Sequence, residues 1–239
     1  MLIKKFASLF NLDYRVKHDN DTMGNAGRSM VEMLGVLAII GVLSVGAIAG
    51  YSKTMMKYKL NKHTENFNIL LNETIKLLPD LERHYGKILQ QSYTLNSFFN
   101  KANLLPDGMS YKNGGIYDIF NNRINISYAK HGTVGTIGAE YYMDILMNRS
   151  GNNITAHDKE VCRNIMLTAK ENYENISSIQ MRSENGNSYS AKNLQGALSR
   201  TQTNPLNKAT IAQIDDLCNS CNSETYCRIY LYLSVKTYN

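Results

Sequence analysis

Residues 33–52 read MLGVLAIIGVLSVGAIAGYS, twenty consecutive residues without a charged side chain. A helix of this length spans about 30 Å, which is the thickness of the hydrocarbon core of a bilayer. A secretory signal peptide has a shorter apolar core that begins closer to the N-terminus, and it is followed by an Ala-x-Ala-like site, which is missing here. The stretch therefore predicts one membrane-spanning helix, and it argues against a cytosolic single-domain enzyme.

The rest of the 239-residue chain is polar, and the overall composition is that of a folded protein. Hydrophobic residues make up 43%, close to the globular average, which excludes wholesale disorder. There are 26 Lys and Arg residues against 20 Asp and Glu residues, which gives a net charge of +6. No basic helix or aromatic–basic motif accompanies this excess, so we interpret it as a solvated surface and expect no nucleic-acid partner.

The segment directly before the apolar run, GNAGRSMVE at residues 24–32, ends in a lone carboxylate. Glu32 stands at the edge of an apolar helix, where a charge is costly unless another group pairs with it. A carboxylate at this position is therefore a candidate functional residue. Within the run, Gly46 and Gly50 form a Gly-x-x-x-Gly pair, which allows two helices to approach closely in lipid.

Together these residues resemble the N-terminus of type IV prepilins. In that family a prepilin peptidase removes a leader that ends in Gly, and Glu is the fifth residue of the mature chain. The resemblance implies a leader over residues 1–27, cleavage between Gly27 and Arg28, and Glu32 as the fifth residue. Further positions of the family pattern are matched by Ile39-Ile40-Gly41 and Tyr51.

Three features differ from the commonest prepilins. Arg28 stands where the family usually has an apolar residue, so the resemblance implies the cleavage more firmly than the methylation of the new N-terminus. Ala49 stands where many members have a helix-kinking Pro, which predicts a straighter helix. The leader is long, and a long leader followed by a residue other than Phe resembles the type IVb branch of the family.

Four lysines directly after the run bear on the orientation of the helix: Lys53, Lys57, Lys59 and Lys62. The positive-inside rule alone would leave this side in the cytoplasm. The cysteines further along indicate an oxidising compartment instead, and the resemblance implies a cytoplasmic leader. We therefore expect the chain in the inner membrane before assembly and in an extracellular pilus afterwards, with its head periplasmic or extracellular.

An apolar stripe continues at helical spacing beyond the membrane segment. Its members recur mostly at intervals of three and four residues. They are Met56, Leu60, His63, Phe67, Leu70, Leu71, Thr74 and Leu78. Pro79 predicts the end of the helix. The sequence thus predicts one spine helix over residues 28–78, with its membrane segment at 33–52, and a globular head over residues 79–239.

The pattern of the head predicts an α+β fold. Alternating apolar residues predict strands, and helical spacing with capping residues predicts helices. The expected strands cover residues 123–130, 140–147, 176–181 and 226–235, and the expected helices cover 80–91, 158–173 and 209–217. Residues 104–109 are expected to turn, and residues 183–208, rich in Ser, Asn and Gly, to form a loop with at most one helical turn. A long spine helix followed by such strands predicts packing on a small antiparallel sheet.

The order of these pieces also resembles type IVb pilins of the toxin-coregulated and thin-pilus kind. In those proteins a turn similar to residues 104–109 and a segment similar to Phe120-Asn121-Asn122 precede the first strand. A helix that carries a cysteine, here Cys162, follows the second strand. The resemblance implies a C-terminal region closed by a disulfide.

The four cysteines, Cys162, Cys218, Cys221 and Cys227, all follow the membrane segment. In an exported domain an even number of cysteines predicts disulfides. We favour Cys162–Cys218 with Cys221–Cys227, and the pairing of Cys162–Cys221 with Cys218–Cys227 is nearly as good. A zinc site made by all four thiolates is the rival, because Cys218-x-x-Cys221 has the spacing of metal ligands.

No arrangement of residues indicates catalysis, so we expect neither an enzyme nor a cofactor. His63 lies on the helix stripe, where a packed role is expected, and no glycine-rich phosphate loop is present.

Three functions are compatible with these patterns. The first is a structural subunit of a type IVb-like pilus for adhesion, aggregation or conjugation-related contact. Its expected partners are prepilin peptidase, the inner membrane, the pilus assembly machinery and other copies of the chain in a helical filament. In that filament the new amino group of Arg28 is expected to lie against Glu32 of a neighbouring subunit. The second function is a minor pilin or pseudopilin of a type II secretion or DNA-uptake machine, and the third is a membrane-anchored binding domain with a zinc site.

Overall fold

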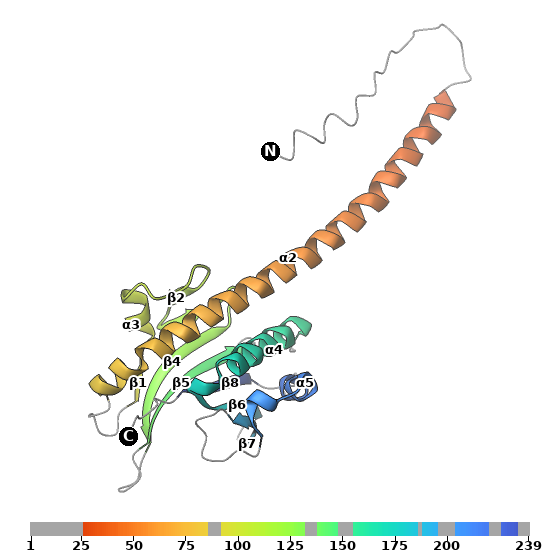
Figure 1. Cartoon of the computed structure of the whole chain (residues 1–239). Helices are drawn as coiled ribbons and strands as arrows, with labels where there is room; N and C mark the ends of the chain where they lie inside the picture. The colour runs from red at the N-terminus through yellow and green to blue at the C-terminus, as the bar shows by residue number, and fades with distance from the viewer. Residues whose placement is uncertain are drawn as a thin grey trace. The chain divides into compact units, whose positions relative to one another are not determined.

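The computed structural model describes residues 26–85, 92–131, 138–147, 155–185, 188–195, 204–219 and 226–233. These residues form a long N-terminal helix and an eight-stranded antiparallel sheet with shorter helices, which is an α+β arrangement (Figure 1). The chain divides into two compact units, residues 1–54 and residues 55–239. Residues 1–25, which make up most of the expected leader, lie outside the described residues.

Helix α2 runs from Ala26 to Tyr85 and contains 60 residues. In the second unit its predicted apolar stripe is confirmed, because six of the eight stripe members are buried and the other two are partly buried. The buried members are His63, Phe67, Leu70, Leu71, Thr74 and Leu78. The buried apolar members of this stripe belong to the same hydrophobic core as residues of the strands.

The expected end of the helix at Pro79 is wrong, because α2 continues through Pro79 to Tyr85. Proline lacks an N–H group, so at this point the helix loses one hydrogen bond to the carbonyl four residues earlier. Leu78 and Leu81 are both buried on either side of the proline, and their burial favours continuing the helix. Residues 80–85 therefore belong to α2 instead of starting a separate helix over 80–91, and residues 86–91 lie outside the described residues.

The sheet is antiparallel throughout, and its last strand in sequence lies near its centre. The order is β2-β3-β4-β5-β8-β6-β7, and β1 pairs with β4 beside this path. The strands are β1 (Ser92–Thr94), β2 (Ser110–Lys112), β3 (Gly115–Tyr117), β4 (Arg123–His131), β5 (Gly138–Met147), β6 (Ile176–Asn185), β7 (Ser188–Gln195) and β8 (Tyr226–Leu233). The four predicted strands are confirmed as β4, β5, β6 and β8, with β6 longer than expected.

Strand β7 lies inside the segment that was expected to be a loop, so that expectation is wrong. Its residues, SYSAKNLQ, are mostly of low β propensity. The strand is held by its pairing with β6, which extends from Ser178↔Gln195 to Asn185↔Ser188. Tertiary pairing therefore decides the conformation here, and local propensity does not. The helical turn allowed for in the same segment is present as the 3-10 helix η3 (Leu206–Lys208).

Two of the shorter helices match the predictions closely. Helix α4 (Ala156–Glu171) begins at Thr155, whose hydroxyl accepts from the Asp158 amide while the Asp158 carboxylate accepts from the Thr155 amide. This reciprocal capping box fixes the start of the helix. Helix α5 (Ile211–Asn219) is capped in the same way by Thr210 and Gln213. A short helix α3 (Asn96–Lys101) and a 3-10 turn η2 (Tyr173–Asn175) complete the helices of the described chain.

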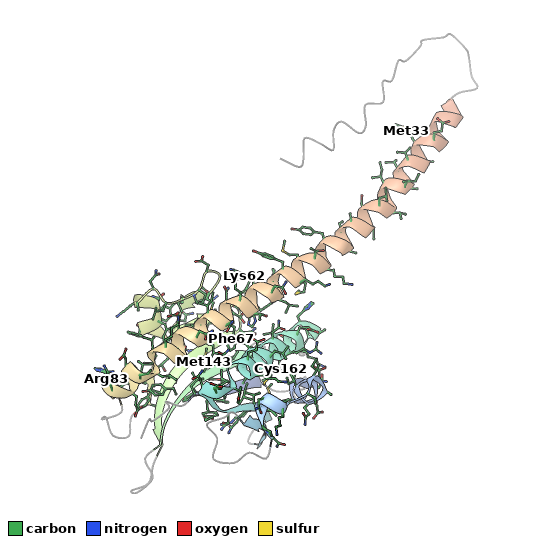
Figure 2. All side chains as sticks on the ribbon, in the orientation of Figure 1. Met33, Lys62, Phe67, Arg83, Met143 and Cys162 are labelled. Atoms are coloured by element: carbon green, nitrogen blue, oxygen red, sulfur yellow. A yellow bond between two sulfur atoms is a disulfide. The ribbon has the colours of Figure 1, made fainter. Side chains whose placement is uncertain are left out.

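One core joins these elements. Alternate residues of β4, β5, β8 and β6 point to the same side of the sheet, and there they meet the stripe of α2 and the apolar face of α4 (Figures 1 and 2). The predicted face of α4 is buried in full: Val161, Cys162, Ile165, Met166 and Ala169. The turn at residues 104–109 is also confirmed, with Gly108 at φ +91° and the Met109 amide donating to the Pro106 carbonyl.

Neighbouring residues of α2 provide a matched test of this packing. Leu70 is fully buried, whereas Ile69 is 42% exposed. Leu70→Ala should lower the free energy of unfolding by about 2–5 kcal/mol, because it removes apolar contacts and leaves a cavity. Ile69→Ala should change it by about 0.5 kcal/mol or less. Urea unfolding of the full chain in detergent micelles measures both values, and equal losses would contradict the assignment of the buried face.

Candidate functional site: the exposed apolar helix and the contacts that hold the head

The first half of α2 exposes an apolar surface of unusual extent. Every side chain from residue 32 to residue 54 is exposed. The large apolar residues from Met33 to Ile48 are between 52% and 75% exposed, and Figure 2 shows side chains projecting from this part of the helix on several sides. The helix is long and apolar enough to cross a membrane. Soluble monomers rarely expose apolar patches of this size, so the surface indicates contact with lipid or with other protein.

Three of the four glycines in this segment lie on one side of the helix. With about 100° per residue, Gly35, Gly46 and Gly50 fall within roughly 60° of one another. A side chain at any of the three would meet no other atom within 4 Å. The helix backbone is therefore accessible along this side, as close packing against a second helix requires.

The predicted cleavage and assembly residues lie at the start of the same helix. Gly27 and Arg28 belong to its first turn, where backbone amides have no partner within the helix. Glu32 is exposed one turn further on, and none of the described basic groups forms an ion pair with it. The side chain of Arg28 lies outside the described ones. The structure thus places the three residues along one helix end, and their expected roles stay predictions.

In the head, a buried contact between a histidine and an aspartate joins α2 to the segment between β3 and β4. His63 Nε2 lies 3.1 Å from Asp118 Oδ2, and the two side chains are 0% and 1% exposed. The imidazole stacks on Phe67 at 6.1 Å and meets Phe120 at 5.8 Å between ring centroids. The two atoms are close, but the contact does not meet the angles of a directed hydrogen bond.

Asp118 is held as an acceptor by its own segment. Its Oδ1 accepts from the amides of Phe120 and Asn122 at 2.9 and 2.8 Å, and its Oδ2 accepts from the Asn122 side chain at 2.9 Å. These three hydrogen bonds fix the orientation of the Asp118 side chain. Both side chains are closed off from solvent, and the contact ties α2 to the segment between β3 and β4, so we interpret it as a positioning contact. The packed role expected for His63 is confirmed, and the sequence analysis missed Asp118.

A disulfide joins α4 to α5. Cys162 and Cys218 are bonded, with their Cα atoms 5.9 Å apart, so the favoured pairing is confirmed for this bond and the alternative Cys162–Cys221 is wrong. The same bond excludes a zinc site made by all four thiolates. The second expected pair includes Cys221, which lies outside the described residues. No described cysteine is free, and Cys227 is buried in β8.

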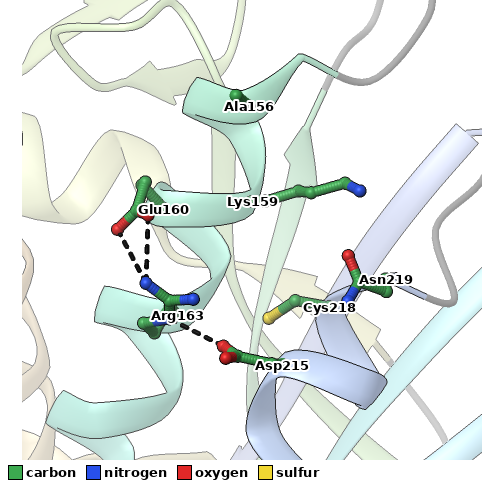
Figure 3. A pocket seen from close by; sticks show the side chains of 7 residues that line it. All are labelled: Ala156, Lys159, Glu160, Arg163, Asp215, Cys218 and Asn219. Atoms are coloured by element: carbon green, nitrogen blue, oxygen red, sulfur yellow. Dashed lines mark hydrogen bonds and ion pairs between the residues drawn. The ribbon is translucent and has the colours of Figure 1, made fainter. Parts of the chain in front are cut away.

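A small pocket of about 180 Å³ lies beside this disulfide, between α4 and α5 (Figure 3). Arg163 at its edge donates to Asp215 at 2.7 Å and to Glu160 at 3.0 Å. The hydrogen bond that Arg163 donates to Asp215, with the nearby charge of Glu160, raises the pKa of the Arg163 guanidinium above its ordinary value. Three of the charged groups that line the pocket, Arg163, Glu160 and Asp215, are thus paired with one another, and Cys218 is bonded in the disulfide. Among the described residues no cluster of His, Cys, Asp and Glu could hold a metal ion.

Comparison of the chain with family models, curated proteins and solved structures gave no match.

The buried contact can be tested against an exposed aspartate of the same region. Asp118→Ala should lower the free energy of unfolding by about 3–5 kcal/mol, because it leaves two backbone amides and the Asn122 side chain without their acceptor and removes the contact of the buried imidazole. Asp107→Ala, at an exposed position of the turn, should cost about 0.5 kcal/mol or less. Chemical unfolding gives both values. His63→Phe should cost clearly less in the Asp118→Ala background than in the parent, and strictly additive losses would rule out a direct coupling.

Proposed function

We propose that this chain is the precursor of a type IV pilin, resembling the type IVb branch, which is processed after Gly27 and polymerised into a surface filament. The observation that carries the proposal is the continuous exposure of the apolar half of α2, from residue 32 to residue 54, directly after the Gly27–Glu32 pattern. An exposed apolar surface of this length needs lipid before assembly and other helices after it.

Both environments suit the composition of this segment. In the inner membrane, residues 33–52 span the hydrocarbon core as one helix. In the filament, the same apolar side chains pack against those of neighbouring subunits. The accessible backbone at Gly35, Gly46 and Gly50 lets neighbouring helices come close, which supports tight packing where no water remains.

In this proposal an attraction between opposite charges sets the register of neighbouring subunits in the filament. Glu32 has no counter-charge among the described groups of its own subunit, and taking an unpaired carboxylate out of water costs several kcal/mol. Removal of the leader by prepilin peptidase creates an amino group at Arg28. In the low-dielectric interior of the filament, attraction between this amino group and Glu32 of a neighbour guides each subunit into place.

The head is the part of the subunit that faces the surroundings in this proposal. The Cys162–Cys218 bond suits a periplasmic or extracellular location, where disulfides persist. Adhesion, aggregation or conjugation-related contact are the roles that such a surface would serve, and the assembly machinery is the partner that extracts the subunit from the inner membrane.

Processing provides the first test. The membrane-extracted protein should begin at Arg28, because the peptidase requires Gly before the cut and places Glu fifth after it. Intact-mass measurement should show the loss of residues 1–27 from the subunit of sheared surface fibres. A fibre subunit that retains Met1 would contradict the proposal.

Assembly provides the second test. Glu32→Gln removes the charge and keeps the shape, so the subunit should be expressed, processed and membrane-bound while fibres fail to grow. Glu65→Gln is the matched control, since Glu65 is an exposed carboxylate of the same helix that already pairs with Lys62 at 3.0 Å. Electron microscopy of sheared fibres distinguishes the two variants. Fibres as abundant in Glu32→Gln as in the parent would rule out the pairing.

A further inference from the structure

Three lysines of α2 stand out because no described carboxylate compensates their charge. No acidic residue occurs between Glu32 and Glu65. Further along the helix three exposed or partly exposed basic residues each have an acid three positions away: Lys62 with Glu65, Lys76 with Glu73 and Arg83 with Asp80. Lys53, Lys57 and Lys59, the juxtamembrane lysines, have no described carboxylate within 4.0 Å.

Their distance from the apolar run matches the headgroup layer of a bilayer. At 1.5 Å per residue they lie about 1.5, 7.5 and 10.5 Å beyond Ser52 along the helix axis. A headgroup layer is roughly 5–8 Å thick on each side of the hydrocarbon core. Side chains of a helix lean toward its N-terminus, so these lysines lean back toward the apolar run and can reach the headgroups from their positions.

Two exposed tyrosines support the same placement. Tyr51 is 68% exposed and Tyr58 is 61% exposed. Tyrosines are enriched at the level of the headgroups, where the ring is apolar and the hydroxyl is hydrated. The end of the apolar run therefore carries both kinds of residue that anchor a helix at a membrane surface.

We propose that Lys53, Lys57 and Lys59 bind the anionic phospholipid headgroups of the leaflet on the head's side of the membrane. This inference rests on the membrane insertion of residues 33–52 in the proposed function, and it does not depend on polymerisation. It also explains why a basic cluster follows the span, although the positive-inside rule would place such a cluster in the cytoplasm. These lysines contact lipid headgroups on the side of the membrane where the head lies. A lysine near an anionic surface enriches such lipids by a factor of about five, which corresponds to about 1 kcal/mol.

The chain contains no tryptophan, so a single tryptophan at position 58 reports on the lipids around this site. The full chain with Tyr58→Trp is reconstituted in lipid vesicles of phosphatidylcholine with 25% phosphatidylglycerol, which contain no other protein. Energy transfer from the tryptophan is measured to a trace of dansyl-labelled lipid of either headgroup. Transfer to the labelled phosphatidylglycerol should exceed transfer to the labelled phosphatidylcholine, with a local ratio of the two lipids about fivefold or more above their ratio in the bulk bilayer. High salt should reduce the difference.

Two triple variants identify the site. Lys53→Gln/Lys57→Gln/Lys59→Gln should bring the two transfers to equality. Lys101→Gln/Lys159→Gln/Lys208→Gln removes the same charge from exposed positions of the head and should leave the enrichment unchanged. Thermal unfolding of both variants checks that the head remains folded.

Several outcomes would overturn the inference. Equal transfer to both lipids in the parent excludes a preference for anionic headgroups, and in that case a preference for an acidic protein partner becomes the better explanation. Loss of the preference in both triple variants assigns it to net charge and not to this site. If the chain does not float with the vesicles in a density gradient, the membrane anchor itself is contradicted. If it inserts without a lipid preference, only this inference is contradicted.

Discussion

The head of this protein depends on one stripe of helix α2 closing its core. The antiparallel sheet buries one face, and the apolar side of α4 is too short to cover it. Phe67, Leu70 and Leu71 fill the remaining space and are fully buried. The same helix is exposed on all sides from residue 32 to residue 54. A single element thus serves the core of the head at one end and offers an uncovered apolar surface at the other.

The polar contact inside this core determines which part of α2 meets the sheet. An apolar stripe can slide by a turn at modest cost, because leucine and phenylalanine pack in several arrangements. The His63–Asp118 contact has one arrangement, since Asp118 is fixed by three donors of its own segment and His63 lies between two aromatic rings. Buried charged pairs add little stability over apolar residues, so we interpret this one as setting the register of the helix on the head.

Periodicity predicted the parts of this fold whose residues repeat a pattern over several positions. The stripe of α2, the face of α4 and the alternation in β4 and β8 are long enough for the burial pattern to appear in the sequence. The missed parts depend on distant partners. β7 is made by pairing with β6, the three-residue strands β1, β2 and β3 are too short to alternate, and Pro79 is kept in a helix by the burial of Leu78 and Leu81. Asp118 gave only a weak sequence signal, an acidic residue shortly before Asn121-Asn122, because its importance comes from a histidine 55 positions earlier.

Charge compensation along α2 follows the solvent that each part of the helix meets. Where the helix lies on the head and faces water, acids and bases occur together at a spacing of three residues, as Lys62–Glu65 and Lys76–Glu73 do. Such exposed pairs contribute less than about 1 kcal/mol each, so they are affordable wherever water is present. At the two ends of the apolar run this compensation is missing among the described groups: Glu32 has no described counter-charge, and three lysines follow the run without a described acid. A charge left without a counter-charge beside an apolar surface favours pairing with a group of another molecule. Under the proposed function the two ends of the helix would therefore have partners of opposite charge, an amino group for Glu32 and anionic headgroups for the lysines, because the neighbouring charges that would otherwise satisfy them are missing.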